Sequence, residues 1–363
     1  MSILSLHGDL GGPTVAAAAA QRLEKLWKAV HRSDCPADVR SLLSSAVLPW
    51  GARLLSRTSI WPSDIGSDHS PFEFSVAFVP DAPEIRVVVE AQGNTSTFRA
   101  TRDACLRLNE SLAVQGADTR CMDDVYDLFL PDVLHARFAL WHGLTLVPGR
   151  MRAKVYLNPQ IHGTARAEGV IEEALERLHM SHAWSTVISR LPRRQLRGEE
   201  LRYFALDLES RESARAKVYL YLEDVTADDL ERLAASRSDY QPGEVTAFCQ
   251  AMTGSKGPYL TRPPCVYVGF RGSSSVPSDV TVQIPIGHYV SDDRVARDRI
   301  RGYLRSRGLE TTTYERALDA IAERPLEEGA GLHTYVSLRT ATDPVRVTAY
   351  FAADLYASRH RAS

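Results

Sequence analysis

One five-residue sequence occurs twice in this chain and constrains its fold more than any other feature. The sequence Arg-Ala-Lys-Val-Tyr at residues 152–156 is repeated without change at residues 215–219, an offset of 63 residues. Side chains of a β-strand point alternately to its two faces. The arginine, lysine and tyrosine of each copy therefore share one face, and the alanine and valine share the other. The repeat predicts two strands with a cationic, phenolic face suited to a strongly anionic ligand beside an aromatic group.

Further strand-like runs form hairpin pairs with these two copies or with each other. Helical stretches are predicted between the pairs, at 167–191, from the Thr226 capping box to about 235, at 291–305, and from 312 to near Pro325. Five hairpins imply about ten strands, a number that closes into one barrel with helices outside. The predicted pairs are 73–80 with 85–91, 138–147 with 152–157, 201–208 with 215–222, 264–271 with 279–286, and 332–339 with 345–352.

The polar face recurs in most of these runs, and this decides which way the barrel faces. Arg339, Arg346 and Gln283 continue the polar set, whereas the opposite faces carry valine, leucine and phenylalanine. The apolar faces must meet the helices, because burial there yields the hydrophobic gain. We predict an α+β fold, a ten-stranded antiparallel β-barrel with a polar lumen, ringed by helices. A two-layer α+β sandwich, with its polar face toward solvent, is the alternative.

The length and composition indicate the number of domains, the partners that can be excluded and the cellular compartment. The chain of 363 residues is predicted to be a single domain, 1–363, with an N-terminal helical segment at 13–60 and a barrel core at about 71–356. A net charge of −2 gives no basic field for nucleic acid, and no apolar run is long enough to span a membrane. The five dispersed cysteines fit a cytoplasmic protein without disulfides or a zinc site. A monomer and a homodimer both remain open.

The polar lumen suggests a specific chemistry. Arginine binds diphosphate in a bidentate manner, lysine acts as a point charge, and a tyrosine hydroxyl donates a hydrogen bond. Aromatic faces also stabilise a cation through the ring quadrupole. A site with both features would ionise an allylic diphosphate and shield the carbocation. Glu73, inside an otherwise apolar strand, is the candidate for orienting an acceptor N–H or collecting a proton. A solvent-facing glutamate on an edge strand is the alternative for Glu73.

The chain resembles the soluble aromatic prenyltransferases of the ABBA barrel, of the dimethylallyltryptophan synthase type. The resemblance covers residues 71–356 and is carried by the segment SPFEFSVAF at 70–78, the paired R-x-K-x-Y strands and VTAYF at 347–351. It implies metal-independent transfer of a dimethylallyl group from dimethylallyl diphosphate to the indole of tryptophan or of a tryptophan-derived compound, in secondary metabolism. A longer donor and a larger indole or phenol acceptor remain alternatives.

The resemblance also assigns roles to individual residues. Glu73 falls on the glutamate that bonds the indole N–H and assists deprotonation, and Arg202 on the arginine that holds the amino-acid end of the acceptor. The diphosphate would be bound by Arg86, Lys154, Arg215, Lys217 and Gln283. The carbocation would be shielded by Tyr156, Tyr219, Tyr267, Tyr335 and Tyr350.

The chain departs from the family pattern at one place. Members that prenylate C4 of the indole carry a lysine shortly before the first R-x-K-x-Y strand, where this chain reads Ala-Leu-Trp-His-Gly at 139–143. The departure argues against C4 and leaves C5, C6, C7 and N1 open. His142 is a candidate base at this place, and a purely structural histidine is the alternative.

Two other interpretations compete. Asp123, Asp124 and Asp127 spell D-D-x-x-D, the motif with which chain-elongating isoprenyl synthases bind magnesium and diphosphate. Those enzymes are all-helical, whereas this chain shows ten strand-like runs, so we interpret the aspartates as a solvated helix start and predict no metal and no requirement for Mg²⁺. The second competitor is a non-catalytic barrel that binds an aromatic or phosphorylated metabolite.

Overall fold

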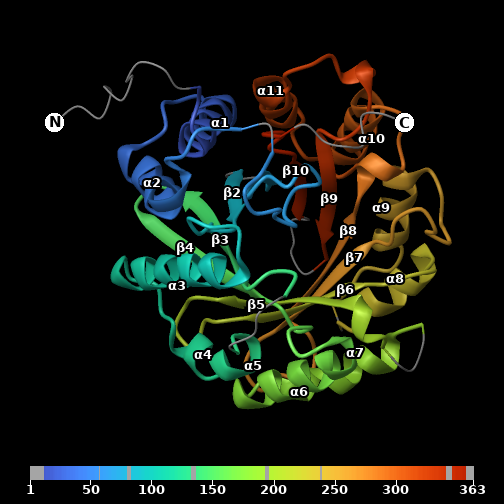
Figure 1. The fold of residues 1–363 in the computed structure, drawn as a ribbon. Helices are drawn as coiled ribbons and strands as arrows, with labels where there is room; N and C mark the ends of the chain where they lie inside the picture. Colours follow the sequence, from blue (N-terminus) through green and yellow to red (C-terminus); the bar gives the residue numbers. More distant parts are fainter. Residues whose placement is uncertain are drawn as a thin grey trace.

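A closed barrel of antiparallel strands forms the centre of the molecule (Figure 1). The computed structural model describes residues 12–56, 58–79, 83–131, 136–192, 196–237, 239–340 and 346–356, and ten barrel strands lie within them. Each strand pairs with its neighbours in the chain, and β10 closes the ring on β1. This topology confirms the predicted barrel. The strands are β1 (Phe72–Phe78), β2 (Glu84–Val89), β3 (Leu140–Val147), β4 (Arg150–Leu157), β5 (Leu201–Asp207), β6 (Ala216–Tyr221), β7 (Cys265–Phe270), β8 (Asp279–Ile284), β9 (His333–Arg339) and β10 (Arg346–Phe351).

Helices surround the barrel and cover its apolar outer face (Figure 1). On β1, Phe72, Phe74 and Val76 are fully buried there, as the period-two pattern predicts. The helices are α1 (Val15–His31), α2 (Ala37–Gly51), α3 (Phe98–Val114), α4 (Arg120–Asp123), α5 (Tyr126–Phe129), α6 (Ala167–Arg177), α7 (Trp184–Arg190), α8 (Ala227–Ala234), α9 (Glu244–Thr253), α10 (Asp293–Ser306) and α11 (Thr312–Ile321). Single 3-10 turns lie at Thr164–Arg166, Ser181–Ala183, Gly198–Glu200, Ile286–His288 and Leu326–Glu328.

The predicted helical stretch at 167–191 is two helices, α6 and α7, joined by a sharp turn. His179 adopts a left-handed backbone with φ of 57°, and the Met180 N–H donates to the Leu175 carbonyl at 2.7 Å. This is the hydrogen bond of a Schellman motif, which ends a helix. Glycine usually occupies the left-handed position at a helix end. Because this chain has a histidine there, the sequence contains no glycine that would predict the break. The capping box at Thr226 is present as predicted, with Asp229 as its partner.

The N-terminal helices are fastened to the last strand. Helices α1 and α2 lie inside the predicted helical segment at 13–60. The buried guanidinium of Arg22 on α1 donates to the carbonyls of Ala352 and Ala353, just after β10, at 3.0 and 2.8 Å. Helix α1 also packs against α11. The two ends of the predicted single domain, residues 1–11 and 357–363, lie outside the described residues.

Candidate active site

The direction of the strands sorts the lumen side chains along the barrel axis. Because neighbours are antiparallel, residues early in an odd-numbered strand share one end of the barrel with residues late in an even-numbered strand. The registers agree, since Glu73 lies opposite Val88 and Lys154 lies opposite both Gly143 and Asp207. We call the two ends of the lumen the cationic end and the Glu73 end. The cationic end carries Glu84, Arg86, Arg152, Lys154, Asp207, Arg215, Lys217, Asp279, Arg339 and Arg346, and the Glu73 end carries Glu73, Trp141, Tyr203, Tyr221 and Tyr335.

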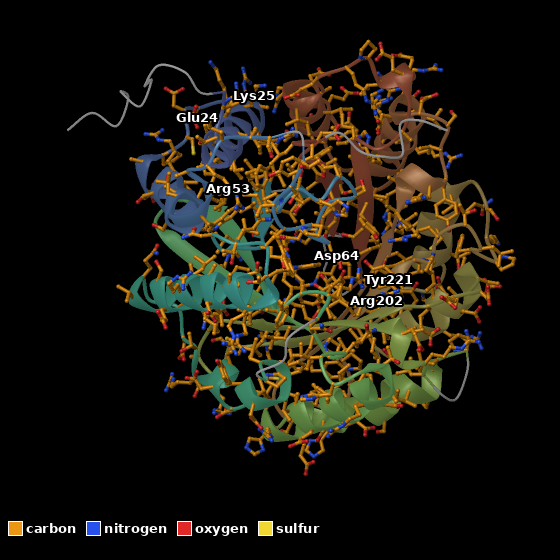
Figure 2. All side chains as sticks on the ribbon, in the orientation of Figure 1. Glu24, Lys25, Arg53, Asp64, Arg202 and Tyr221 are labelled. Atoms are coloured by element: carbon orange, nitrogen blue, oxygen red, sulfur yellow. The ribbon has the colours of Figure 1, made fainter. Side chains whose placement is uncertain are left out.

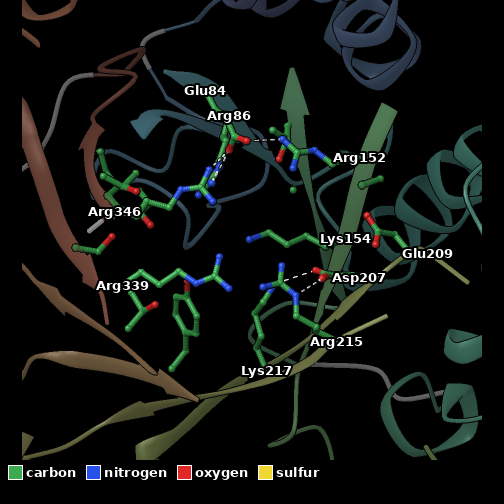
Figure 3. A pocket seen from close by; sticks show the side chains of 18 residues that line it. Glu84, Arg86, Arg152, Lys154, Asp207, Glu209, Arg215, Lys217, Arg339 and Arg346 are labelled. Carbon is green, nitrogen blue, oxygen red and sulfur yellow. Dashed lines mark hydrogen bonds and ion pairs between the residues drawn. The ribbon is translucent and has the colours of Figure 1, made fainter. Parts of the chain in front are cut away.

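Positive charges outnumber negative ones at the cationic end (Figure 3). Seven cationic side chains line its pocket with the carboxylates of Glu84, Asp207 and Glu209, and Asp279, 3.0 Å behind Arg339, adds a fourth carboxylate. The excess of three positive charges suits a strongly anionic ligand. The cations are Arg86, Arg152, Lys154, Arg215, Lys217, Arg339 and Arg346.

The carboxylates of this end hold the cations in place. Glu84 pairs with Arg86 at 2.8 Å, with Arg152 at 2.5 Å and with Arg346, so it joins three strands. Burial would raise the pKa of Glu84, but the three arginines lower it to about 2. Across the pocket, Asp207 binds Lys217 at 2.8 Å and Arg215 at 2.9 Å. These pairs orient the cations before any ligand arrives.

Lys154 is the least compensated of these cations. It makes no ion pair with a carboxylate in the described part of the chain, and its ammonium lies 4.7 Å from the ring centroid of Tyr156. Burial, together with the neighbouring charges of Lys217 and Arg86, lowers the pKa of Lys154. Burial and Arg86 likewise lower the pKa of Arg346 to about 10. A bound anion would therefore stabilise the charged forms of both side chains.

Gly143 makes room for Lys154 on the neighbouring strand. A Cβ atom at position 143 would lie 2.6 Å from Cε and 3.0 Å from Cγ of Lys154, closer than side-chain carbons pack. Because Gly143 is the register partner of Lys154, the lysine can lie flat across β3 and extend into the pocket. Here the absence of a side chain makes room for a cation of the pocket.

Tyrosines form a belt between the two ends. The ring of Tyr219 lies 5.6 Å from that of Tyr156 and 4.9 Å from that of Tyr267. Tyr335, at the Glu73 edge of this belt, has its ring 6.4 Å from that of Tyr350, and Gln283 Nε2 donates to the Tyr350 hydroxyl at 3.0 Å. The five predicted tyrosines thus gather in one lumen. Their electron-rich faces can stabilise a cation formed beside the cationic end.

The Glu73 carboxyl faces the lumen at the opposite end. Its Oε1 accepts a hydrogen bond of 2.7 Å from Thr334 Oγ1 on β9. Burial raises the pKa of Glu73 to about 8, although the hydrogen bond from Thr334 opposes the rise. The hydroxyls of Tyr335 and Tyr221 are 3.3 Å apart and extend the polar surface toward the rim of this end. The arrangement suits a group that accepts a hydrogen bond from a ligand N–H.

The structure places Arg202 and His142 in different surroundings. Arg202 lies at the Glu73 end, with its guanidinium 5.6 Å from the ring of Tyr221. His142 lies on the helix-facing side of the barrel wall, where it pairs in register with the buried Val89 and Val155. Its ring is fully buried outside the lumen, and burial lowers its pKa to about 3. The prediction of His142 as a base is therefore wrong.

Several site residues were missed by sequence reasoning. Trp141 and Tyr203 line the Glu73 end with ring centroids 5.0 Å apart, and Phe138 packs 4.5 Å from Trp141. The hairpin register held the signal, since Trp141 lies opposite Tyr156 and Tyr203 lies opposite Tyr219, and directly opposite residues share a face. Arg152, Arg339 and Arg346 were seen on polar faces without an assigned role, and Glu84, Asp207 and Asp279 were not considered.

A second buried carboxyl, Glu90, follows β2 on the lumen side. It is fully buried, and it faces the hydroxyl of Ser63 and the indole N–H groups of Trp141 and Trp61. Burial raises the pKa of Glu90 to about 7. The carboxyl thereby lies beside the Trp141 ring, which lines this side of the Glu73 end.

The aspartate motif at 123–127 lies outside the lumen. Asp124, just after the short helix α4, pairs with Arg211, and Asp127 on α5 pairs with Arg177 at 2.6 Å. Within the ranges that the structure describes, no group of three histidine, cysteine or acidic side chains is arranged to hold a metal ion. The described helices include none long and apolar enough to cross a membrane. All five cysteines are buried and free.

Comparison with known proteins identifies a matching family and similar solved structures. The family model for tryptophan dimethylallyltransferase matches residues 39–317. The chain is similar to 6-dimethylallyltryptophan synthase from Micromonospora olivasterospora in complex with DMASPP and Trp, with 32% identity, a TM-score of 0.88 and coverage of 95% of this chain and 99% of that chain.

Two further solved structures are similar over nearly the whole chain. For 5-dimethylallyl tryptophan synthase from Streptomyces coelicolor with DMASPP and Trp, the identity is 31%, the TM-score 0.86, and the coverage 96% of this chain and 97% of that chain. For the prenyltransferase PriB in a ternary complex with L-tryptophan and dimethylallyl thiolodiphosphate, the corresponding values are 29%, 0.86, 95% and 97%.

Proposed function

Because the chain belongs to the tryptophan dimethylallyltransferase family, we propose that it transfers the dimethylallyl group of dimethylallyl diphosphate to the indole ring of tryptophan. The observation that carries the proposal is the order of groups along the lumen. An excess of cations lies at one end, a belt of tyrosines in the middle, and the Glu73 carboxyl at the other end. A reaction that separates an anion from a carbocation, and then delivers the cation to an N–H heterocycle, needs these groups in this order.

Ionisation would take place at the cationic end. The bond between C1 of the dimethylallyl group and the diphosphate oxygen breaks, and its electron pair leaves with the diphosphate. Negative charge grows on the leaving group in the transition state, and cations already in place stabilise that charge most. Lys154 is suited to this role, because it has no carboxylate partner in the described structure and extends toward the pocket (Figure 3).

The carbocation would then meet the indole between the tyrosine faces. A ring carbon forms a bond to the allyl cation, and the resulting arenium ion loses its ring proton to restore aromaticity. The rings of Tyr156, Tyr219 and Tyr267 contact one another at tilted angles, and their faces would shield the cation from water. Glu73 would accept a hydrogen bond from the indole N–H, raise the nucleophilicity of the ring and assist the loss of the proton.

The acceptor would extend from Glu73 toward Arg202. Its carboxylate would be bound by Arg202, whose Nε is buried and unpartnered within the described structure. The similar synthases are named for attachment at C5 and at C6. Together with Trp141 in the region where C4-prenylating members carry lysine, this supports attachment on the benzene ring away from C4. NMR of the product would identify the carbon.

The proposed reaction uses side-chain cations in place of a metal. The first test is incubation of the protein with tryptophan and dimethylallyl diphosphate, with and without EDTA, followed by mass spectrometry. We expect a mass gain of one C5 unit and equal rates in both samples. A product that forms only with added Mg²⁺ would overturn the account of the cationic end. Binding of both compounds without any product would instead favour a non-catalytic carrier.

The reaction would run in the cytoplasm. The five cysteines are free and buried, a pattern suited to a reducing compartment. Localisation of a tagged chain by fractionation of its native cell would test this assignment.

A further inference from the structure

Three charged side chains lie at the rim of the Glu73 end, and chemistry at the indole ring does not use them. Arg137 Nε donates a hydrogen bond to Asp64 Oδ2. Arg202 lies nearby over the ring of Tyr221. Figure 2 labels Asp64, Arg202 and Tyr221 over the same central part of the barrel. The rim therefore carries two cations and one carboxylate. Arg202 comes from β5, and Arg137 and Asp64 come from the segments that precede β3 and β1.

The packing of adjacent residues places Asp64 and Arg137 at the lumen. Ile65, directly after Asp64, packs against the aromatic cluster that contains Trp141, Tyr203 and Tyr219, and Phe138, directly after Arg137, belongs to that cluster. The charges of both Arg137 and Asp64 act on the buried Tyr203 hydroxyl, and that of Arg137 also acts on Tyr221. The pair thus sits where the chain enters the aromatic wall of the Glu73 end.

The pair also remains open to a ligand. The side chains of Asp64 and Arg137 are 31% and 37% exposed. Their hydrogen bond involves Oδ2 of the carboxylate, and Oδ1 has no recorded partner among the described residues. A bound group that carries a positive charge could therefore reach Oδ1 without displacing Arg137.

We propose that Asp64 binds the α-ammonium group of the acceptor and so restricts the reaction to free α-amino acids. The inference rests on the proposed function and specifies its acceptor. A zwitterion presents one cation and one anion on the same carbon, and the rim offers Asp64 for the first and Arg202 for the second. Acylation of the amine, or its inclusion in a peptide ring, removes the charge that Asp64 would bind, and the charged hydrogen bond to Oδ1 is lost.

The competing explanation is that Asp64 and Arg137 only fasten the loop before β1 to the segment before β3. Both explanations predict a loss of activity when Asp64 is changed. They differ in the acceptors for which activity falls, because a purely structural role of the ion pair lowers activity with every acceptor equally. The selectivity between acceptors with and without the amine therefore separates the two.

The test compares tryptophan with indole-3-propionic acid, which has the same ring and carboxylate but no amine. We expect Asp64→Asn to lower the ratio of kcat/KM for tryptophan to that for indole-3-propionic acid by roughly tenfold to a hundredfold, the usual range for a lost charged hydrogen bond. Asp64→Glu, which keeps the charge, should restore part of the ratio. Asp239→Asn, at an exposed aspartate that pairs with Arg237, is the matched control.

An unchanged ratio in Asp64→Asn would overturn the proposal, whether total activity falls or not. If the protein turns over no acceptor at all, calorimetric binding of L-tryptophan and indole-3-propionic acid gives the same ratio without catalysis. A binding preference for tryptophan that Asp64→Asn removes would then support the ammonium site even though the proposed reaction had failed. If Asp64→Asn does not fold, the variant Asp64→Glu decides between the two explanations. The ammonium site predicts a lowered ratio of kcat/KM for tryptophan to that for indole-3-propionic acid in this variant, whereas a purely structural ion pair leaves the ratio at the wild-type value.

Discussion

At the scale of single residues, Glu73 is a carboxyl group whose surroundings oppose its ionisation. Burial raises its pKa to about 8, so the acid form predominates below that pH. Its proposed role requires the carboxylate. We therefore expect kcat/KM to rise with pH through an inflection near 8, since a group with a raised pKa loses its proton only there. Steady-state rates between pH 6 and 9.5 would measure this.

The variant Glu73→Gln provides the control for this pH dependence. The amide cannot titrate, so turnover should fall by about 10²- to 10⁴-fold and lose the inflection, while diphosphate binding persists. Glu90→Gln should keep the inflection near 8, because it removes a different buried carboxyl whose pKa is raised to about 7. An inflection near 8 that survives in Glu73→Gln would assign the titration to another group.

Gly143 is a second residue whose effect can be predicted. In Gly143→Ala the new Cβ would overlap Cε and Cγ of Lys154, so the lysine must move out of its position in the pocket. A displacement of about 1 Å of a catalytic group can cost ~10²-fold in rate. We expect kcat/KM for dimethylallyl diphosphate to fall by roughly that factor. Gly169→Ala on α6, where the Cβ meets nothing within 4 Å, is the control and should retain wild-type rates.

The residue scale also shows what sequence can and cannot supply. Lys154, Tyr156 and their copies on β6 were placed in the lumen correctly, because one period-two pattern fixed every side chain of the strand. The same rule explains the error at His142, since a shift of one position exchanges the two faces and puts Trp141 in the lumen. The hydrogen bond between Glu73 and Thr334 joins residues 261 positions apart, and no local pattern encodes it.

At the scale of elements, strands were easier to predict than helices. Most strand ends lie within two residues of the predicted ones, because each strand is buried on its outer face and turn residues bound it. The break between α6 and α7 was missed, since the apolar periodicity continues across His179 and the terminating hydrogen bonds belong to the backbone. The ion-pair partners across β2, β4 and β10 were missed as well, because barrel closure brings them together.

The attachment of α1 to the end of β10 gives a prediction at this scale. Arg22→Leu would remove two charged hydrogen bonds and leave the carbonyls of Ala352 and Ala353 without this donor. We expect a loss of roughly 2–4 kcal/mol in the free energy of unfolding, and a fall in Tm of about 3–8 °C. Lys25→Leu, at an exposed position on the same helix (Figure 2), should change Tm by less than about 1 °C. Equal shifts in the two variants would show that the contact does not fasten the helix.

At the scale of the whole molecule, the barrel separates two electrostatic environments within one lumen. The cationic end is held together by Glu84, Asp207 and Asp279, which pair with several cations but do not neutralise them. Folding must therefore confine like charges in a partly dry interior, at a cost in stability. The barrel can bear this cost because its outer face and its helices bury a continuous apolar core. A site preorganised for an anion is in this sense a strained feature of the empty protein.

This interpretation predicts that activity and stability oppose each other at Lys154. Lys154→Met removes the cation without a carboxylate partner, so Tm of the ligand-free protein should rise by a few degrees as repulsion from Lys217 and Arg86 falls. Inorganic diphosphate should raise Tm of the wild type by several degrees at ~100 Kd, because it binds the folded state alone. The variant should lose most of that shift and most of its turnover, whereas Lys25→Met should behave as wild type. A ligand-free variant less stable than the wild type would mean that Lys154 contributes packing or pairing that outweighs the repulsion, and that the empty cationic end is not strained.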